Sequence, residues 1–304
     1  MTILFLVVLH VPHGPDPNKL DSSCNEDSMA PLSNNQDISS MTNGVTEVVS
    51  EETLQLDEPD AQSDSHVRKR MKKITKKKGQ GTFSGAADED YSTSVKKYRK
   101  QRYHLFSRYD DGVKLDEEGW FSVTPEPIAN HHALRCGSNA IIDGFTGVGG
   151  NAIQFAKCAK HVIAVDIDPK KIEYANHNAV IYEVDDRIDF VRGDFFLLAP
   201  RLKADTVFLS PPWGGPNYKK VERYDIKTML KPHDGFLLFK TAKGIASKVV
   251  MFLPKNVDIN QLAELSLSSC PPWSLEVERN FLNGRLKAIT AYFTNPEISM
   301  NNDQ

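Results

Sequence analysis

Short apolar runs alternate with longer amphipathic runs between residues 139 and 265. The apolar runs predict strands at 140–142, 161–166, 188–191, 206–210 and 248–253. The amphipathic runs predict helices at 151–160, 169–182, 234–246 and 258–265. Strands that alternate with helices in this way form a parallel sheet with helices on both faces, so we expect a doubly wound α/β core.

Two further apolar segments, 275–282 and 285–293, close the pattern. They are joined by Asn283-Gly284, the strongest short signal for a β-hairpin, because both turn residues must accept a positive φ. A mostly parallel, seven-stranded sheet with a C-terminal antiparallel hairpin is the plan of Rossmann-like class I methyltransferases. Dinucleotide-binding dehydrogenases usually lack the hairpin, so by analogy it favours the methyltransferase fold.

Composition divides the chain into four parts. Residues 1–90 are rich in Ser, Asn, Asp, Glu and Pro, and predict a disordered tail because they bury too little apolar surface to offset the entropy of ordering. Residues 91–138 predict a helical extension, with a basic, aromatic helix at 95–106. Residues 139–296 form the expected Rossmann-like core, and residues 297–304 a flexible C-terminus.

Charge is unevenly distributed, so the net charge of −3 conceals opposite electrostatic fields. Acidic residues dominate 1–65, whereas basic residues dominate 66–108 and peak in the run RKRMKKITKKK at 68–78. Such a run is either a solvated linker or a tract that serves nuclear localisation or RNA contact. Like charges at this density repel one another unless an anionic partner balances them, which favours the second interpretation. We therefore expect an anionic partner and a nuclear location.

Several features argue against export and against a metal. The apolar run Ile3 to Leu9 has no basic residue before it and no small-residue cleavage site after it, unlike a signal peptide. The four cysteines are widely spaced, which fits neither a zinc site nor a disulfide framework. His131 and His132 lack a third ligand at sensible spacing, so we expect them to be surface residues and expect no metal.

A glycine-rich turn follows the first predicted core strand, and an acidic residue, Asp143, precedes its glycines. A carboxylate at that position would repel a pyrophosphate but suits a cationic ligand such as S-adenosylmethionine. The second strand ends at Asp166, whose carboxylate can accept hydrogen bonds from two ribose hydroxyls. Asp168, which precedes Pro169, is better explained as a helix cap.

A third acidic residue, Asp194, follows the third strand and is suited to an adenine amino group, with Phe195 beside the ring. Open α/β sheets bind ligands at the carboxyl ends of their strands, and the three acids lie at such ends. Together they predict an S-adenosylmethionine site.

The tetrapeptide Ser210-Pro211-Pro212-Trp213 follows the fourth strand. Its prolines fix a rigid turn without N–H donors, which leaves carbonyl acceptors free. A hydroxyl and a carbonyl that accept hydrogen bonds from a nucleobase amine make its nitrogen a better nucleophile and aim it, while Trp213 offers a stacking face. The alternative is a purely structural role, as a proline-rich loop with a buried tryptophan. We interpret the similar stretch Pro271-Pro272-Trp273 in that structural way.

These residues resemble those of the trimethylguanosine synthases, which methylate the N2 amine of the 7-methylguanosine RNA cap. The resemblance spans about residues 95–293, and its most specific parts are WFSVTPE at 120–126 and SPPWGG at 210–215. Further matches lie at 97–108, 147–151, 166–169, 193–195 and 280–283.

The resemblance implies roles for individual residues. Trp213 stacks on the positively charged base, Ser210 and Pro211 hold its amine, and Asn178 lies on its edge. The extension contributes to cofactor and cap binding, and Lys97 meets cap phosphates. The residues expected at the cofactor are Phe106, Thr124, Asp143, Phe145, Gly147, Asp166, Asp194 and Phe195.

The implied product is the 2,2,7-trimethylguanosine cap of small nuclear and small nucleolar RNAs. The implied partners are capped RNA and snRNP proteins, with no membrane. The implied location is the nucleus, including the nucleolus or Cajal bodies, and the cytoplasm is a further option.

Three alternatives remain open. One is a methyltransferase for adenine N6 or guanine N2 in other RNA or DNA, and a second is an inactive protein that only holds caps. The retained cofactor acids argue against the inactive protein. A nucleotide-binding dehydrogenase is disfavoured by Asp143 and by the hairpin.

Overall fold

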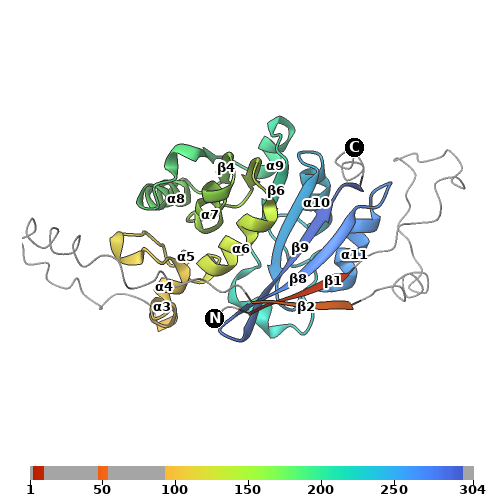
Figure 1. The fold of residues 1–304 in the computed structure, drawn as a ribbon, viewed down its shortest axis with the longest axis horizontal. Coiled ribbons are helices and arrows are strands. Elements are labelled where there is room, and N and C mark those ends of the chain that lie inside the picture. The colour runs from red at the N-terminus through yellow and green to blue at the C-terminus, as the bar shows by residue number, and fades with distance from the viewer. Residues whose placement is uncertain (1–2, 10–46, 54–92, 297–304) are drawn as a thin grey trace, which may run out of the picture.

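Nine strands form one sheet in the computed structural model, which describes residues 3–9, 47–53 and 93–296. The strand order is β2-β1-β8-β9-β7-β6-β3-β4-β5, and β7, β6, β3, β4 and β5 run parallel (Figure 1). The bounds are β3 Ala140–Asp143, β4 His161–Asp166, β5 Ile188–Arg192, β6 Thr206–Leu209, β7 Lys248–Pro254, β8 Ser274–Leu282 and β9 Arg285–Thr294. Strands β3 to β9 form the predicted seven-stranded, mostly parallel sheet with a C-terminal hairpin, which is confirmed, and β1 and β2 extend it to nine strands.

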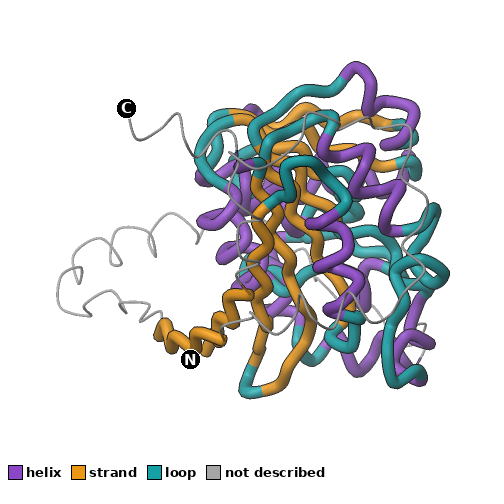
Figure 2. Tube along the Cα trace, turned by 90° about the vertical axis from the view of Figure 1, so that its right-hand side faces the viewer, coloured by secondary structure: helices purple, strands orange, loops and turns teal. Residues whose placement is uncertain are grey.

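Helices cover both faces of this sheet, each over its own apolar core. Helices α6, α7 and α8 pack on one face and α9, α10 and α11 on the other, as Figure 1 shows for the longer helices. Their bounds are α6 Glu126–Cys136, α7 Gly150–Cys158, α8 Pro169–Ile181, α9 Phe195–Leu198, α10 Gly235–Lys243 and α11 Ile259–Leu267. Figure 2 shows the same layers from the side.

Local signals in the sequence set several boundaries. Asn283 and Gly284 have φ angles of 51° and 70°, so the turn between β8 and β9 has the positive φ values that its residues predicted. At the start of α8 the Asp168 carboxylate accepts a hydrogen bond from the backbone N–H of Lys170 at 2.8 Å, which confirms it as the helix cap.

The extension before the sheet is helical but more broken than expected. The single helix predicted at 95–106 is two helices, α3 (Thr93–Arg99) and α4 (Arg102–Leu105), and α5 (Gly119–Ser122) follows. Helix α6 was not predicted from the sequence. The predicted surface location of His131 and His132 is wrong, because α6 lies against α7 and the C-terminal strands and buries both imidazoles.

Two strands occupy parts of the segment that was expected to be a disordered tail. β1 (Ile3–Leu9) pairs antiparallel with β8, with Phe5 opposite Arg279, and β2 (Glu47–Thr53) pairs antiparallel with β1. Without β1, the backbone groups of β8 would form an open edge, and an apolar segment of high strand propensity is suited to pair with it.

Residues 10–46 and 54–92, including the basic run at 68–78, lie outside the described residues. Among the residues that are described, no helix has the length and apolar character needed to cross a membrane.

Candidate active site

The predicted site residues gather at one edge of the sheet. Because β6, β3, β4 and β5 are parallel neighbours, the residues at or just after their carboxyl ends lie side by side. These residues are Ser210, Asp143, Asp166 and Asp194. Backbone hydrogen bonds join the loops, with N···O distances of 3.0 Å from Gly144 to Phe208, 2.9 Å from Thr146 to Val165 and 2.9 Å from Gly193 to Asp166.

The glycine-rich turn between β3 and α7 adopts a conformation that its glycines permit. Gly147 and Gly149 have φ angles of 53° and 90°, which ordinary side chains rarely adopt. A Cβ atom on Gly149 would lie 3.1 Å from the Cα of Ala175, so the turn also packs directly against α8. The turn thereby brings its backbone N–H groups close to the carboxylate at the end of β4.

Asp143 is a buried carboxyl group with an incomplete set of hydrogen bonds. Its Oδ2 accepts a hydrogen bond from the Thr146 hydroxyl at 3.1 Å, whereas its Oδ1 has no partner among the described residues. Burial raises the pKa of Asp143 to about 7, although the Thr146 hydrogen bond opposes the rise. A buried carboxylate oxygen without a partner is costly. A cationic group placed beside it would offset that cost, so Asp143 fits the amino group of S-adenosylmethionine.

Asp166 is held in a fixed orientation by two backbone donors. Its Oδ2 accepts from the N–H of Gly147 at 2.9 Å, and its Oδ1 accepts from the N–H of Asp168 at 3.0 Å. Burial nevertheless raises its pKa above the ordinary value. Each oxygen keeps lone-pair capacity, so the carboxylate can still accept hydrogen bonds from a pair of ribose hydroxyls.

Replacing Asp166 with alanine is expected to weaken S-adenosylmethionine binding by about 10- to 100-fold, because two hydrogen bonds are lost at a net cost of about 0.5–1.5 kcal/mol each. Isothermal titration calorimetry measures the dissociation constant. Asp168→Ala, which removes only a helix cap, is the matched control and should change the constant little. An unchanged constant in Asp166→Ala would move the ribose contact elsewhere.

The third acidic residue and the neighbouring aromatic rings complete this edge. Asp194 caps α9, its Oδ1 accepting from the N–H of Phe196 at 2.8 Å. Phe195 is 3% exposed and its ring centroid lies 5.6 Å from that of Phe145, which is half-buried. Phe145 therefore offers more surface to an adenine ring than Phe195 does, and the adenine contact of Asp194 stays a prediction.

The extension contributes Phe106 and Thr124, both of which are buried. The Phe106 ring lies 6.1 Å from that of Tyr182 on the end of α8. The Thr124 Oγ1 accepts a hydrogen bond from Asn151 Nδ2 at 2.8 Å, so its own hydroxyl hydrogen is left to be donated. An acceptor such as the carboxylate of a bound amino-acid moiety matches that donor.

Sequence reasoning missed Glu126, which anchors the segment carrying Phe106. Its carboxylate accepts hydrogen bonds from the backbone N–H and the hydroxyl of Ser107 and from the Tyr182 hydroxyl, the last two at 3.0 Å. Lys157 lies 3.8 Å from the same carboxylate. The available signal was an acidic side chain directly after Pro125, at the start of what proves to be α6.

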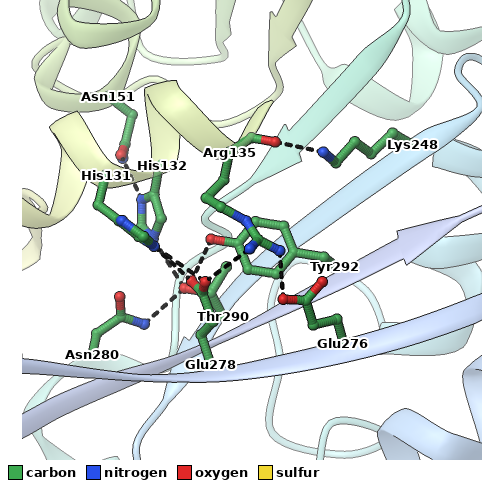
Figure 3. Close-up of polar contacts among 10 residues, drawn as sticks. All are labelled: His131, His132, Arg135, Asn151, Lys248, Glu276, Glu278, Asn280, Thr290 and Tyr292. Carbon is green, nitrogen blue, oxygen red and sulfur yellow. Dashed lines mark hydrogen bonds and ion pairs between the residues drawn. The ribbon is translucent and has the colours of Figure 1, made fainter. Parts of the chain in front are cut away.

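Sequence reasoning also missed a buried polar network between α6 and the C-terminal hairpin (Figure 3). His132 lies 3.2 Å from Asn151 Oδ1 through its Nδ1 and 2.9 Å from the Thr290 hydroxyl through its Nε2. Asn280 donates to the same hydroxyl at 2.8 Å. Burial lowers the pKa of His132 to about 4, so the imidazole is neutral at physiological pH. Asn151 Oδ1 can only accept a hydrogen bond, so the proton of the neutral His132 imidazole is on Nδ1. The hydrogen bonds therefore all point the same way, from Asn280 through Thr290, His132 and Asn151 to Thr124.

A second part of this network is ionic. His131 Nε2 lies 3.0 Å from Glu278, the Tyr292 hydroxyl donates to Glu278 at 2.7 Å, and Arg135 pairs with Glu276 at 2.6 Å (Figure 3). Burial tends to raise the pKa of Glu278, but the hydrogen bonds from His131 and Tyr292 and the positive charge nearby together hold the pKa below its usual value. Both parts of the network fix α6, and with it Thr124, to the sheet.

The Ser210–Trp213 loop is fixed from several sides. The Ser210 hydroxyl donates to the carbonyl of Phe145 at 3.2 Å, which keeps its lone pairs available to an amine donor. The Trp213 indole N–H donates to the carbonyl of Phe252 at 3.2 Å, and its ring lies 5.2 Å from that of Tyr218 in an edge contact. Trp213 stays half-buried, whereas Trp273 of the similar Pro-Pro-Trp stretch is buried against Phe239.

The other two predicted substrate residues are Asn178 and Lys97. Asn178 is fully buried, its Oδ1 accepting from the N–H of Lys114 at 2.8 Å and its Nδ2 donating to the carbonyls of Lys114 and Val148 at 2.9 and 3.0 Å. Both amide hydrogens are used in these contacts, so Asn178 ties the extension to the glycine-rich turn, and its contact with the base edge stays a prediction. Lys97 lies in α3, and its side chain is outside the described residues.

The fold has a counterpart among solved structures. A putative methyltransferase from Porphyromonas gingivalis W83 matches with a TM-score of 0.51 and 16% identity, over 66% of this chain and 49% of that one. The strand order, the terminal hairpin and the acids at the carboxyl edge define a class I methyltransferase that uses S-adenosylmethionine.

Residues 138–296 match the model of the RNA cap guanine-N2 methyltransferases, and the chain belongs to this family. It is 41% identical to the trimethylguanosine synthase of Schizosaccharomyces pombe, over 66% of this chain and 86% of that protein. It is 40% identical to the trimethylguanosine synthase of Saccharomyces cerevisiae, over 59% of this chain and 60% of that protein. The family's activity, methylation of the cap guanine at N2, is thereby the activity of this chain.

Proposed function

We propose that this enzyme methylates the N2 amine of the 7-methylguanosine cap on small nuclear and small nucleolar RNAs, and that it adds two methyl groups to give the 2,2,7-trimethylguanosine cap. The observation that carries this proposal is the position of the Ser210–Trp213 loop. Ser210 is hydrogen-bonded to the loop that follows Asp143, so the amine-binding group and the cofactor acids share one edge of the sheet.

Trp213 has a chemical reason to prefer the methylated base. A 7-methylguanine ring carries a positive charge, and a cation over an indole face gains about 0.5–2 kcal/mol. Stacking of a base on an aromatic side chain contributes about 1–3 kcal/mol whether or not the base is charged. Because the indole N–H and two neighbouring rings already fix Trp213, little further ordering is required when the base binds.

The amine is activated by acceptors of this chain. The Ser210 Oγ and the Pro211 carbonyl accept the two N–H bonds of N2, which increases electron density on the nitrogen and aims its lone pair. S-adenosylmethionine, when bound, supplies a methyl group on a sulfonium that leaves as a neutral thioether. The nitrogen would bond to that methyl carbon as the carbon–sulfur bond breaks, and the surplus proton would then pass to water. After one transfer a single N–H remains, and either acceptor can hold it for the second.

The test is methyl transfer to 7-methyl-GTP, run beside GTP and an adenine-containing oligonucleotide. We expect one- and two-methyl products from 7-methyl-GTP, at a kcat/KM about 2- to 30-fold above that for GTP, which is the ratio that a cation–π energy of about 0.5–2 kcal/mol gives. Transfer only to the oligonucleotide would overturn the cap as substrate. A product that stops at one methyl would overturn the two-step reaction.

The location and the protein partners are part of the proposal. The basic run at 68–78 supports import into the nucleus, where small nuclear and nucleolar RNAs and their snRNP proteins are available. Imaging of a fluorescent fusion to residues 60–92 tests the location, and an even distribution between nucleus and cytoplasm would contradict it.

A further inference from the structure

A strongly basic segment follows the base-binding loop and has no part in the chemistry described so far. Residues 219–231 contain five basic and two acidic residues. Lys219, Lys220, Arg223, Lys227 and Lys231 are all exposed. The segment belongs to the connection between β6 and α10, so it starts from the same strand end as the Ser210–Trp213 loop.

Ion pairs neutralise only part of this charge. Arg223 pairs with Asp258 at 3.4 Å and Lys227 with Glu264 at 2.7 Å. Asp225, an acid within the segment, instead accepts hydrogen bonds from the backbone N–H of Lys227 and from the Gln261 amide. Within the described parts of the chain, Lys219, Lys220 and Lys231 form no ion pair, and we call these three residues the lysine cluster.

The lysine cluster lies beside the base-binding loop. The backbone N–H of Lys231 donates to the carbonyl of Pro212 at 3.2 Å. The Lys219 ammonium lies 5.5 Å from the centroid of the Tyr218 ring, which contacts the Trp213 ring edge to face. Two lysines are thus joined to the base-binding loop, Lys231 through its backbone and Lys219 through the Tyr218 ring.

The backbone that carries the lysines is held to the core. Asn256 donates from its Nδ2 to the carbonyls of Tyr218 and Val221 at 3.2 and 2.9 Å, one on each side of Lys219 and Lys220. Tyr224, which is fully buried, donates from its N–H to the carbonyl of Asn256 at 2.7 Å. Lys219 and Lys220 thus extend from an anchored backbone, and positive charges beside a binding loop suit a chain of regularly spaced anions.

We propose that the lysine cluster binds the phosphodiester backbone of the RNA that follows the cap. This inference rests on the proposed function, because it takes the cap guanine to be bound at Trp213. The charge has the sign that RNA requires, and the contact carries no base specificity, so RNAs of different sequence are accepted behind one common cap. A substrate with an RNA chain then binds more tightly than the cap nucleotide alone.

The test compares a cap nucleotide with a capped RNA in two variants. Lys231→Ala and the double variant Lys219→Ala/Lys220→Ala are assayed with 7-methyl-GTP and with a capped 20-nucleotide RNA. Each contact to a single-stranded phosphate releases about 0.7 of a counterion, which is worth about fivefold in affinity at 0.1 M salt. We expect KM for the capped RNA to rise about fivefold per lysine, with a salt dependence shallower by about 0.7 per lysine, and KM for 7-methyl-GTP to stay within about twofold.

The matched control is Lys160→Ala/Lys203→Ala, which removes two exposed lysines near the amino ends of β4 and β6, at the opposite edge of the sheet. It should leave both substrates unchanged. Unchanged kinetics on capped RNA in the cluster variants would overturn the proposal. An equal loss on both substrates would also overturn it, because the lysines would then act on the cap itself. Failure of the wild-type enzyme on 7-methyl-GTP would instead count against the proposed function.

Discussion

Replacing Trp213 with alanine is expected to lower kcat/KM for 7-methyl-GTP by about 100-fold or more, because stacking and the cation–π contact are lost together. The dissociation constant for S-adenosylmethionine should stay within about twofold, since the cofactor acids lie on β3, β4 and the loop after β5. Steady-state kinetics and calorimetry on the same preparation measure the two effects.

The conservative variant Trp213→Phe separates the stacking role from packing. It loses the indole hydrogen bond to Phe252 but keeps an aromatic face, so we expect it to retain most of the activity that alanine loses. A wild-type rate in Trp213→Ala would refute the stacking role. Equal loss in both variants would assign the effect to the position of the loop instead.

Replacing Asp143 with asparagine is expected to produce the second large effect, a loss of S-adenosylmethionine binding with a gain in stability of the free protein. The folded-state pKa of about 7 lies above the ordinary value of 3.8, so the folded protein favours the protonated carboxyl. The free energy of unfolding of the wild type therefore falls as pH rises from about 4 to about 7, and stays low above that. An amide is neutral at every pH and removes this dependence.

Cofactor binding should show the opposite trend with pH. At pH 6 about nine-tenths of the Asp143 carboxyl groups are protonated in the free protein, and binding a cation requires the ionised form. We expect the wild-type dissociation constant to be about tenfold weaker at pH 6.0 than at pH 7.5, and a flat profile in Asp143→Asn. Calorimetry at both pH values measures this, and a flat wild-type profile would show that Asp143 does not carry the charge that the cofactor meets.

The sequence predicted the core better than it predicted the extension, for physical reasons. The strands β3 to β7 and the hairpin depend on apolar runs and on turn residues such as Asn283-Gly284, which are local signals. The predicted positions of Asp143, Asp166 and Asp194 followed from the same strand ends. Helix α6 has a weakly amphipathic sequence because it is buried on several sides, so its periodicity gave little signal.

The misplacement of His132 and the unpredicted contacts of Asn178 share one cause. Both are polar side chains that contact groups far away in the chain, His132 a group 158 residues distant and Asn178 one 64 residues distant. A local pattern contains no information about such partners, so a buried polar residue is easily mistaken for one that meets the solvent. The strand β1 is a similar case, because its partner β8 lies at the other end of the chain.

The polar network between α6 and the hairpin also determines when the enzyme becomes complete during its synthesis. Asn280 and Thr290, the residues that hold His132, lie on β8 and β9, which are synthesised after all the other described strands. Until those strands pair, the imidazole and the Glu278 partner of His131 have no fixed positions, and α6 is held only by its apolar contacts. The position of Thr124 at the cofactor site therefore depends on residues of β8 and β9, so we expect a chain that ends before these strands to carry the catalytic loop without a fixed Thr124.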